Sequence, residues 1–212
     1  INAIPGANLP LATLGMFILW LGWFGFNGGS QLVVSNISDA NAVAQIFVNT
    51  NAAAAGGLIA GLVVARILFG KADLTMALNG ALAGLVAITA EPLTPSGLQA
   101  TLIGAVGGVI VVFSVLALDK LKIDDVVGAI PVHLLAGIWG TFIVPWSNAD
   151  TSFGTQIIGI VSYGVFTLVC SFVVWFILKA IMGLRVSAEE EIMGLDKAEI
   201  GVEAYPEFSK AS

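Results

Sequence analysis

Long apolar stretches alternate with short polar connectors along most of this 212-residue chain. A helix needs about 20 apolar residues to cross the hydrocarbon core of a bilayer, and six stretches reach or approach that length. The pattern predicts six membrane-spanning helices, at about residues 9–34, 42–69, 74–90, 97–118, 126–144 and 155–182. Because no connector is long enough to form a domain, residues 1–186 are expected to form one transmembrane bundle of an all-α, polytopic membrane protein.

The composition supports a membrane protein and shows where the charge lies. Hydrophobic residues make up 58% of the chain and charged residues only 10%, which excludes an ordinary soluble domain. Most of the net charge of −6 comes from residues 187–212, which carry seven acidic and two basic side chains. This segment is too polar to enter a bilayer, so we expect it to form an acidic cytoplasmic tail. Its charge gives no reason to expect a nucleic-acid partner.

The basic side chains indicate the orientation of the spans. They occur only around the second and fourth connectors and near or after the end of the sixth span, as Arg66, Lys71, Lys120, Lys122, Lys179, Arg185, Lys197 and Lys210. The positive-inside rule assigns this side to the cytoplasm, so both ends of the chain are expected there. The chain begins with isoleucine and lacks the features of a signal peptide. We therefore expect it to begin within a longer polypeptide.

Glycines at a fixed spacing favour close packing of the spans. Pairs four residues apart occur in four of them, as Gly25/Gly29, Gly57/Gly61, Gly80/Gly84 and Gly104/Gly108. In a bilayer such pairs let two helix backbones approach each other closely. Chance is the alternative, since the chain contains 25 glycines.

The single histidine, His133, lies inside the fifth predicted span. At about 1.5 Å per residue it falls near the middle of the bilayer, where a titratable ring is costly to bury and marks a functional path. A hydrogen bond to a neighbouring helix and a metal site are the alternatives, and the spans offer no second histidine or carboxylate for a metal. Pro131 and Gly128 should kink or loosen the helix before His133. Asp124 and Asp125 suit the helix N-terminus as caps, with a place on the path as the alternative.

The end of the first span carries an unusual polar and aromatic face. At about 100° per residue, Trp23, Phe26, Asn27 and Ser30 fall on one side of the helix, near the outer membrane surface. Aromatic rings and one hydroxyl can hold a small cation. An interfacial belt of aromatic residues is the alternative. Asn49 and Asn79, inside the second and third spans, are explained by hydrogen bonds between helices.

No motif in the chain indicates an enzyme. The sequence contains no phosphate-binding loop, no GxSxG nucleophile motif and no pair of carboxylates within a span. We therefore expect neither catalysis nor a cofactor. The single cysteine, Cys170, excludes an intrachain disulfide and is explained as a small buried apolar residue.

Taken together, these residues resemble the C-terminal half of the ammonium transporter (Amt/Mep/Rh) family. Residues 22–30 look like the sixth span of the family, residues 79–86 like its eighth, and Asp124-Asp125 with Pro131-Val132-His133 like its tenth. The acidic segment after residue 187 is similar to the cytoplasmic tail of bacterial members.

The resemblance implies a fold and a function. The fold has eleven spans, in which two inverted five-helix repeats are followed by a long final helix, and this chain corresponds to the second repeat, the final helix and the tail. It implies ammonium or ammonia transport in the cell membrane by a homotrimer, with an N-terminal half completing each pore. A PII-type regulatory protein is a possible partner at the cytoplasmic face. A sensor of the same fold, signalling through the tail, is the alternative function.

The resemblance also implies roles for individual residues. His133 corresponds to the second of two pore histidines, and Phe26 to one of two stacked phenylalanines that close the pore on the outside. Ser30 corresponds to the outer ammonium site, and Trp23 lines the pore near the histidines. Ammonium would give up a proton at the outer site, and neutral ammonia would cross along the histidines, because a charge is costly to carry through hydrocarbon.

Overall fold

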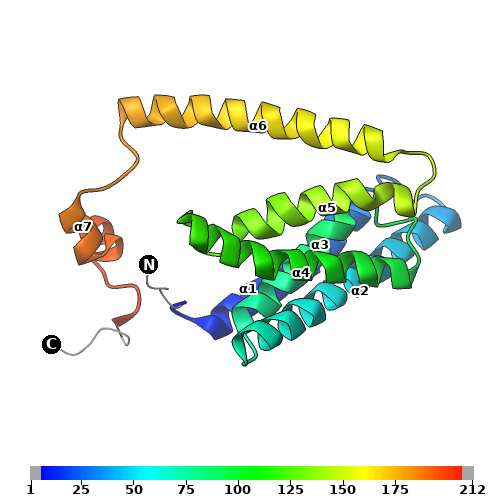
Figure 1. Cartoon of the computed structure of the whole chain (residues 1–212), viewed down its shortest axis with the longest axis horizontal. Coiled ribbons are helices and arrows are strands. Elements are labelled where there is room, and N and C mark those ends of the chain that lie inside the picture. Colours follow the sequence, from blue (N-terminus) through cyan, green and yellow to red (C-terminus); the bar gives the residue numbers. More distant parts are fainter. Residues whose placement is uncertain (1–5, 207–212) are drawn as a thin grey trace. The chain divides into compact units, whose positions relative to one another are not determined.

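The computed structural model describes residues 6–206, and within that range the chain forms helices and no strand (Figure 1). The helices of the apolar part are α1 (Leu9–Gly29), α2 (Ile37–Phe69), α3 (Leu74–Thr89), α4 (Gly97–Leu121), the π-helix η1 (Ile130–Leu135), α5 (Ala136–Ile143), the 3-10 helix η2 (Val144–Trp146) and α6 (Phe153–Ile181). Two short elements follow, α7 (Ala188–Met193) and the π-helix η3 (Asp196–Ile200). The expected all-α fold is confirmed.

The six predicted spans correspond to helices, with differences at their ends. Four of them, α1, α2, α4 and α6, are long and apolar enough to cross a membrane, whereas α3 and the segment Ile130–Trp146 are shorter apolar helices. The first helix ends at Gly29, so residues 31–34 lie outside it, and Leu32 has a positive φ of 64°. The second helix begins at Ile37 rather than near residue 42.

Polar side chains explain where these helices begin. The side chains of Asn36, Asp73 and Ser96 each accept a hydrogen bond from the backbone N–H three residues on, which satisfies one of the free amides of the first turn. Gly70 ends α2 with a φ of 71°, a left-handed conformation that glycine adopts without strain.

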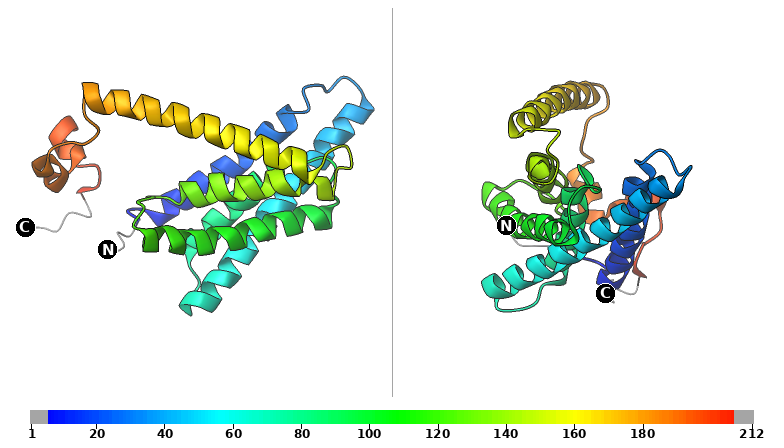
Figure 2. Two further views of the ribbon diagram at one scale, coloured as in Figure 1. Left: turned by 45° about the horizontal axis from the view of Figure 1, so that its top comes forward. Right: turned by 90° about the vertical axis from the view of Figure 1, so that its right-hand side faces the viewer.

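Helices α2, α3 and α4 lie side by side at the centre of the bundle (Figures 1 and 2). Glycines let them approach closely. A Cβ atom added to Gly57 would overlap the backbone of Gly80, one added to Gly84 or Gly104 would overlap Ala53, and one added to Gly108 would overlap Gly57. Three of the four expected glycine pairs thus pack backbone against backbone. The fourth differs, because a Cβ at Gly25 or Gly29 would meet no described atom within 4 Å.

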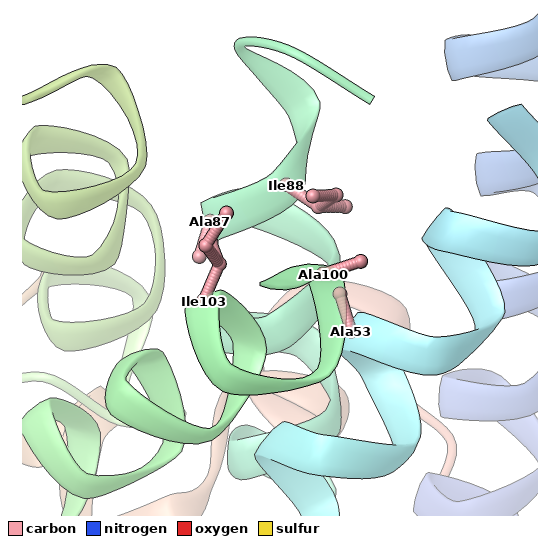
Figure 3. Packing of buried hydrophobic residues seen from close by; sticks show 5 residues of the cluster. All are labelled: Ala53, Ala87, Ile88, Ala100 and Ile103. Atoms are coloured by element: carbon pink, nitrogen blue, oxygen red, sulfur yellow. The ribbon is translucent and has the colours of Figure 1, made fainter. Parts of the chain in front are cut away.

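Small buried side chains fill the space beside these contacts. One cluster joins Ala53 of α2, Ala87 and Ile88 of α3, and Ala100 and Ile103 of α4 (Figure 3). Three of its five members are alanines, which lets the helix axes stay close while apolar surface is still buried. Trp139 of α5 packs against this cluster and donates a hydrogen bond from Nε1 to the Ile103 carbonyl, at 3.0 Å.

The chain divides into two compact units, residues 1–161 and 162–212. Helix α6 contains the boundary. The division expected between a bundle at residues 1–186 and a tail at residues 187–212 stays a prediction.

Within the second unit, short-range hydrogen bonds order the segment after residue 184. Ser187 and Glu190 form a capping box at the start of α7, and Arg185 forms an ion pair with Glu191. The Asp196 carboxylate accepts hydrogen bonds from the N–H groups of Ala204 and Lys197, both at 2.9 Å. Residues 185–204 are therefore held by local hydrogen bonds and one ion pair.

Candidate functional site

The last turns of α1 carry the aromatic rings of Trp23 and Phe26, and the hydroxyl of Ser30 follows directly after the helix. The rings of Trp23 and Phe26 lie 5.7 Å apart between centroids and are tilted by 52°. Phe26 is 62% exposed in this chain, and the Ser30 hydroxyl donates to the Phe26 carbonyl at 2.8 Å. A hydroxyl oxygen that donates its proton in this way keeps lone pairs for another donor. Phe26 can offer a ring face and Ser30 an acceptor to a small cation, while Trp23 lies about one turn further into the helix.

Two side-chain hydrogen bonds hold this part of α1 against its neighbours. Trp23 donates from Nε1 to the Thr89 hydroxyl of α3 at 2.7 Å. Asn27 donates from Nδ2 to the Thr50 hydroxyl of α2 at 3.0 Å. Sequence reasoning placed Asn27 on the same face as Phe26, but the structure buries it against α2, with only 2% of its surface exposed. Thr50 and Thr89 were missed, because nothing in the pattern of α2 or α3 distinguishes them from other small residues.

His133 lies in a π-helical turn, Ile130–Leu135. The Ala136 N–H bonds to the Pro131 carbonyl, five residues back, and Pro131 has no N–H of its own to contribute. Turns of this kind occur mostly as single interruptions of α-helices and are frequent at functional sites. Sequence reasoning expected a loosened helix before His133 without specifying this geometry.

Asp125 fixes the start of that turn. Its carboxylate accepts hydrogen bonds from the N–H groups of Gly128, Ala129 and Ile130, at 3.0, 2.9 and 2.7 Å. Gly128 has a φ of 80°, and a Cβ there would lie 3.0 Å from Nδ2 of Asn79. The lack of a side chain on Gly128 therefore lets α3 pass close to the start of η1.

Asp124, Asn79 and Asn49 have different surroundings. Among the described residues, Asp124 is exposed and its side chain forms no hydrogen bond, so Asp125 alone acts as the cap. Asn79 is half-buried on α3 beside Gly128. Asn49 is buried and donates to the carbonyls of Pro92 and Pro95, which ties α2 to the connector between α3 and α4.

His133 is exposed in this chain. Within residues 6–206 its ring forms no hydrogen bond, and no three His, Cys, Asp or Glu side chains gather to hold a metal ion. The alternative explanation for His133, a hydrogen bond to a neighbouring helix of this chain, thus has no support in the described range.

The structure brings some of the predicted site residues together and leaves others apart. Trp23 and Phe26 lie on α1, which packs against α2 and α3, and Ser30 follows directly after the helix. His133 belongs to η1, which packs against α3, α4 and α5. The two groups therefore lie on elements that share α3 as a neighbour without packing against each other.

A chain of apolar helices with this length and packing is a polytopic, α-helical membrane protein. It belongs to the ammonium transporter family, whose model matches residues 1–205. It is 40% identical to the ammonium transporter Amt2 of Archaeoglobus fulgidus and 38% identical to Amt1 of Haloferax mediterranei, with 98% and 97% of this chain covered.

The alignments cover 48% and 42% of those two proteins, so the chain spans about half the length of its relatives. Two solved structures have a similar fold, and this chain again covers about half of each. A protein described as a sensor Amt protein superposes with a TM-score of 0.86 at 35% identity, over 93% of this chain and 51% of that one. Mep2 of Candida albicans superposes with a TM-score of 0.81 at 27% identity, over 98% of this chain and 51% of that one.

Proposed function

We propose that this chain forms one half of an ammonium-conducting pore, completed by an N-terminal half that resembles it in inverted orientation. The observation that carries the proposal is the exposure of His133 and Phe26, two side chains that belong in a pore wall by resemblance. In this half each faces away from a packed core. Transporters with inverted repeats bind their substrate where the two repeats meet, so an exposed pore wall is expected of a single repeat.

The aromatic and hydroxyl group of α1 is proposed to receive the ammonium ion. Phe26 attracts a cation through its ring face, and the Ser30 oxygen accepts a hydrogen bond from one of the ammonium N–H groups, while Trp23 lines the path further in. These contacts replace part of the water shell that ammonium must lose. The phenyl ring of Phe26 also narrows the entrance, so that water does not follow freely.

His133 is proposed to line the dry part of the path. Ammonium gives up its proton before this point, since a charged ion is costly to move through an apolar pore. Neutral ammonia has a lone pair and three N–H bonds, and an imidazole can both donate to and accept from it. The π-helical turn around Pro131 sets the direction in which this imidazole leaves the helix.

Uptake of ammonium or methylammonium by transporter-deficient cells tests this proposal. The variants His133→Ala and Phe26→Ala are made in the transporter that joins this chain to its N-terminal half. We expect each to reduce uptake at least about tenfold, which corresponds to a transport barrier raised by about 1.4 kcal/mol. Phe17→Ala is the matched control, because Phe17 is also an exposed phenylalanine of α1, at 55%. Undiminished uptake in both site variants would rule out the proposed path.

A sensor is the second candidate, and the similarity to a sensor Amt protein favours keeping it. A sensor would bind ammonium at the same aromatic group with little flux and would signal through residues 187–212. Calorimetric binding of methylammonium together with absent uptake by the unaltered protein would support the sensor over the transporter.

The membrane arrangement is part of the proposal. The protein is proposed to lie in the cell membrane. The positive-inside rule, applied to the basic residues at 66–71 and 120–122, favours both ends of this chain in the cytoplasm. Membrane-impermeant thiol labelling of a cysteine introduced at Lys71 or Asp150, in a Cys170→Ser background, tests this, and labelling of Lys71→Cys from outside would contradict it.

Assembly and regulation are proposed by resemblance. The transporter is a homotrimer, to be measured by native mass spectrometry, and the tail docks on the cytoplasmic face and is available to a PII-type regulator. Unchanged regulation of uptake after deletion of residues 187–212 would contradict a regulatory tail.

A further inference from the structure

Thr89, the last residue of α3, is the centre of a two-step hydrogen-bond chain. Its hydroxyl accepts from Nε1 of Trp23 at 2.7 Å and donates to the Leu85 carbonyl, also at 2.7 Å. Leu85 is fully buried within the bundle. The indole is thereby tied, through one hydroxyl, to the backbone of the most enclosed helix.

Besides the Trp23 and Asn27 hydrogen bonds, the ring pair of Phe24 and Phe47 and a few buried residues fix the rotation of α1. Only Met16, Asn27 and Gly28 of its 21 residues are buried. Apolar packing therefore leaves its outer face largely without contacts. The polar contacts of Trp23 and Asn27 contribute correspondingly more to holding α1 against its neighbours. The two contacts differ in one respect. Trp23 belongs to the proposed pore path, whereas Asn27 is buried against α2.

An indole has one N–H donor and no acceptor, so its N–H edge repels a cation while its ring face attracts one. When Thr89 accepts from the N–H, that edge is occupied and only the ring remains to be offered to a cation. The same bond limits the angles that the ring can take toward Phe26.

We infer that Thr89 is a positioning residue for the aromatic pair of the proposed pore path. It orients the Trp23 ring against Phe26 and occupies the indole N–H, so that the ring lines the path. The inference rests on the proposed function of Trp23 and Phe26 as parts of the pore wall.

The test uses matched substitutions in the transporter with its N-terminal half. Thr89→Val keeps the shape and removes the hydroxyl. We expect the ratio of maximal uptake rate to KM to fall about tenfold, the order expected for one lost hydrogen bond. Thr89→Ser keeps the hydroxyl and should restore uptake. Thr101→Val is the control, since Thr101 makes the same kind of hydrogen bond to a carbonyl four residues back, at 2.8 Å, without an indole partner.

A double-mutant cycle separates positioning from general stability. In a Trp23→Phe background, which lacks the N–H, Thr89→Val should cause little further loss. Ultraviolet resonance Raman spectra provide a readout independent of transport, because the indole band of Trp23 should shift to that of an unbonded N–H in Thr89→Val and stay in Thr89→Ser. Equal losses with and without Trp23, or an unshifted band, would overturn the inference.

The inference and the proposed function fail in different ways. Absent uptake by the unaltered transporter would contradict the function. Normal uptake by both the unaltered transporter and Thr89→Val would contradict only the role of Thr89.

Discussion

Glycines at the centre of the bundle are residues whose replacement the structure makes costly. A Cβ on Gly104 would overlap the carbonyl oxygen, the carbonyl carbon and the Cα of Ala53, all of them backbone atoms. A flexible side chain could move aside, but the backbone of a packed helix moves only if the helices separate. The size of the change is small, yet its location decides the outcome.

We predict that Gly104→Ala destabilises the chain by about 1–3 kcal/mol or more, the usual cost of overpacking. Thermal unfolding of the purified chain in detergent measures this as a lower Tm. Gly25→Ala is the control, because a Cβ there meets no described atom within 4 Å, and alanine is favoured over glycine in a helix by roughly 0.5–1 kcal/mol. A Tm for Gly104→Ala equal to that of Gly25→Ala would contradict the close packing of α2 and α4.

Single residues differ in how far the sequence could predict them. The glycine spacing predicted three of the four close contacts, because helix periodicity places residues four apart on one face. The depth of His133 in the membrane, expected from the length of its apolar run, stays a prediction. The partners of Trp23 and Asn27 could not be predicted, since Thr89 is 66 residues from Trp23 and Thr50 is 23 residues from Asn27. Contacts between helices depend on rotations that no single helix determines.

At the scale of elements, the turn around His133 depends on the residues that precede it. Pro131 removes one backbone donor, Gly128 allows a positive φ, and Asp125 gathers three N–H groups. The sequence predicted an irregular helix here from the first two residues. The π-helical geometry could not be predicted, because it also requires α3 to pass close to Gly128.

We predict that Asp125→Ala lowers stability by about 1–2 kcal/mol, the upper part of the range for a lost helix cap. Three amides lose their acceptor at once, and the turn that carries His133 loses its anchor. Thermal unfolding of the chain measures the loss. Asp124→Ala, which removes a neighbouring exposed carboxylate without hydrogen bonds in the described range, should leave the Tm within error. Equal effects of both substitutions would point to charge rather than capping.

The folded segment after residue 184 should respond to acid. The Ser187 amide and then its hydroxyl hold the pKa of Glu190 below its ordinary 4.5, and the N–H groups of Ala204 and Lys197 hold the pKa of Asp196 below its ordinary 3.8. The Arg185 side chain likewise lowers the pKa of Glu191. Groups with a lowered pKa stabilise the folded form above their unfolded values, and this contribution is lost as the pH falls through the folded values.

We therefore predict that amide hydrogen exchange at Ala204 is slow at neutral pH and becomes relatively faster below about pH 4, after correction for intrinsic rates. Asp196→Ala should abolish the protection at every pH. Glu199→Ala, which removes an exposed carboxylate without a partner among the described residues, should leave it unchanged. Protection that survives at low pH would show that these carboxylates do not hold the segment.

The whole molecule shows why the fold class was easier to predict than the arrangement. Apolar runs and a low content of charge decide that a chain forms membrane helices, and the order of motifs identified the family. Neither indicates that α3, a helix of 16 residues, lies between α1 on one side and the His133 turn on the other. That arrangement depends on contacts between helices, such as Trp23 with Thr89 and Gly128 beside Asn79, which are properties of the assembled bundle.

The last prediction concerns the chain as one half of a pore. If His133 and Phe26 line a wall that a second half must complete, then residues 1–212 alone should support no ammonium uptake in transporter-deficient cells, although they reach the membrane. Co-expression with the N-terminal half of a close family member should restore uptake, because the two halves bury each other's exposed apolar faces. Membrane insertion is checked in both cases by fractionation and immunoblotting. Uptake by the chain alone at the level of the combined halves would show that a pore forms from copies of this chain, and would contradict the proposed partnership.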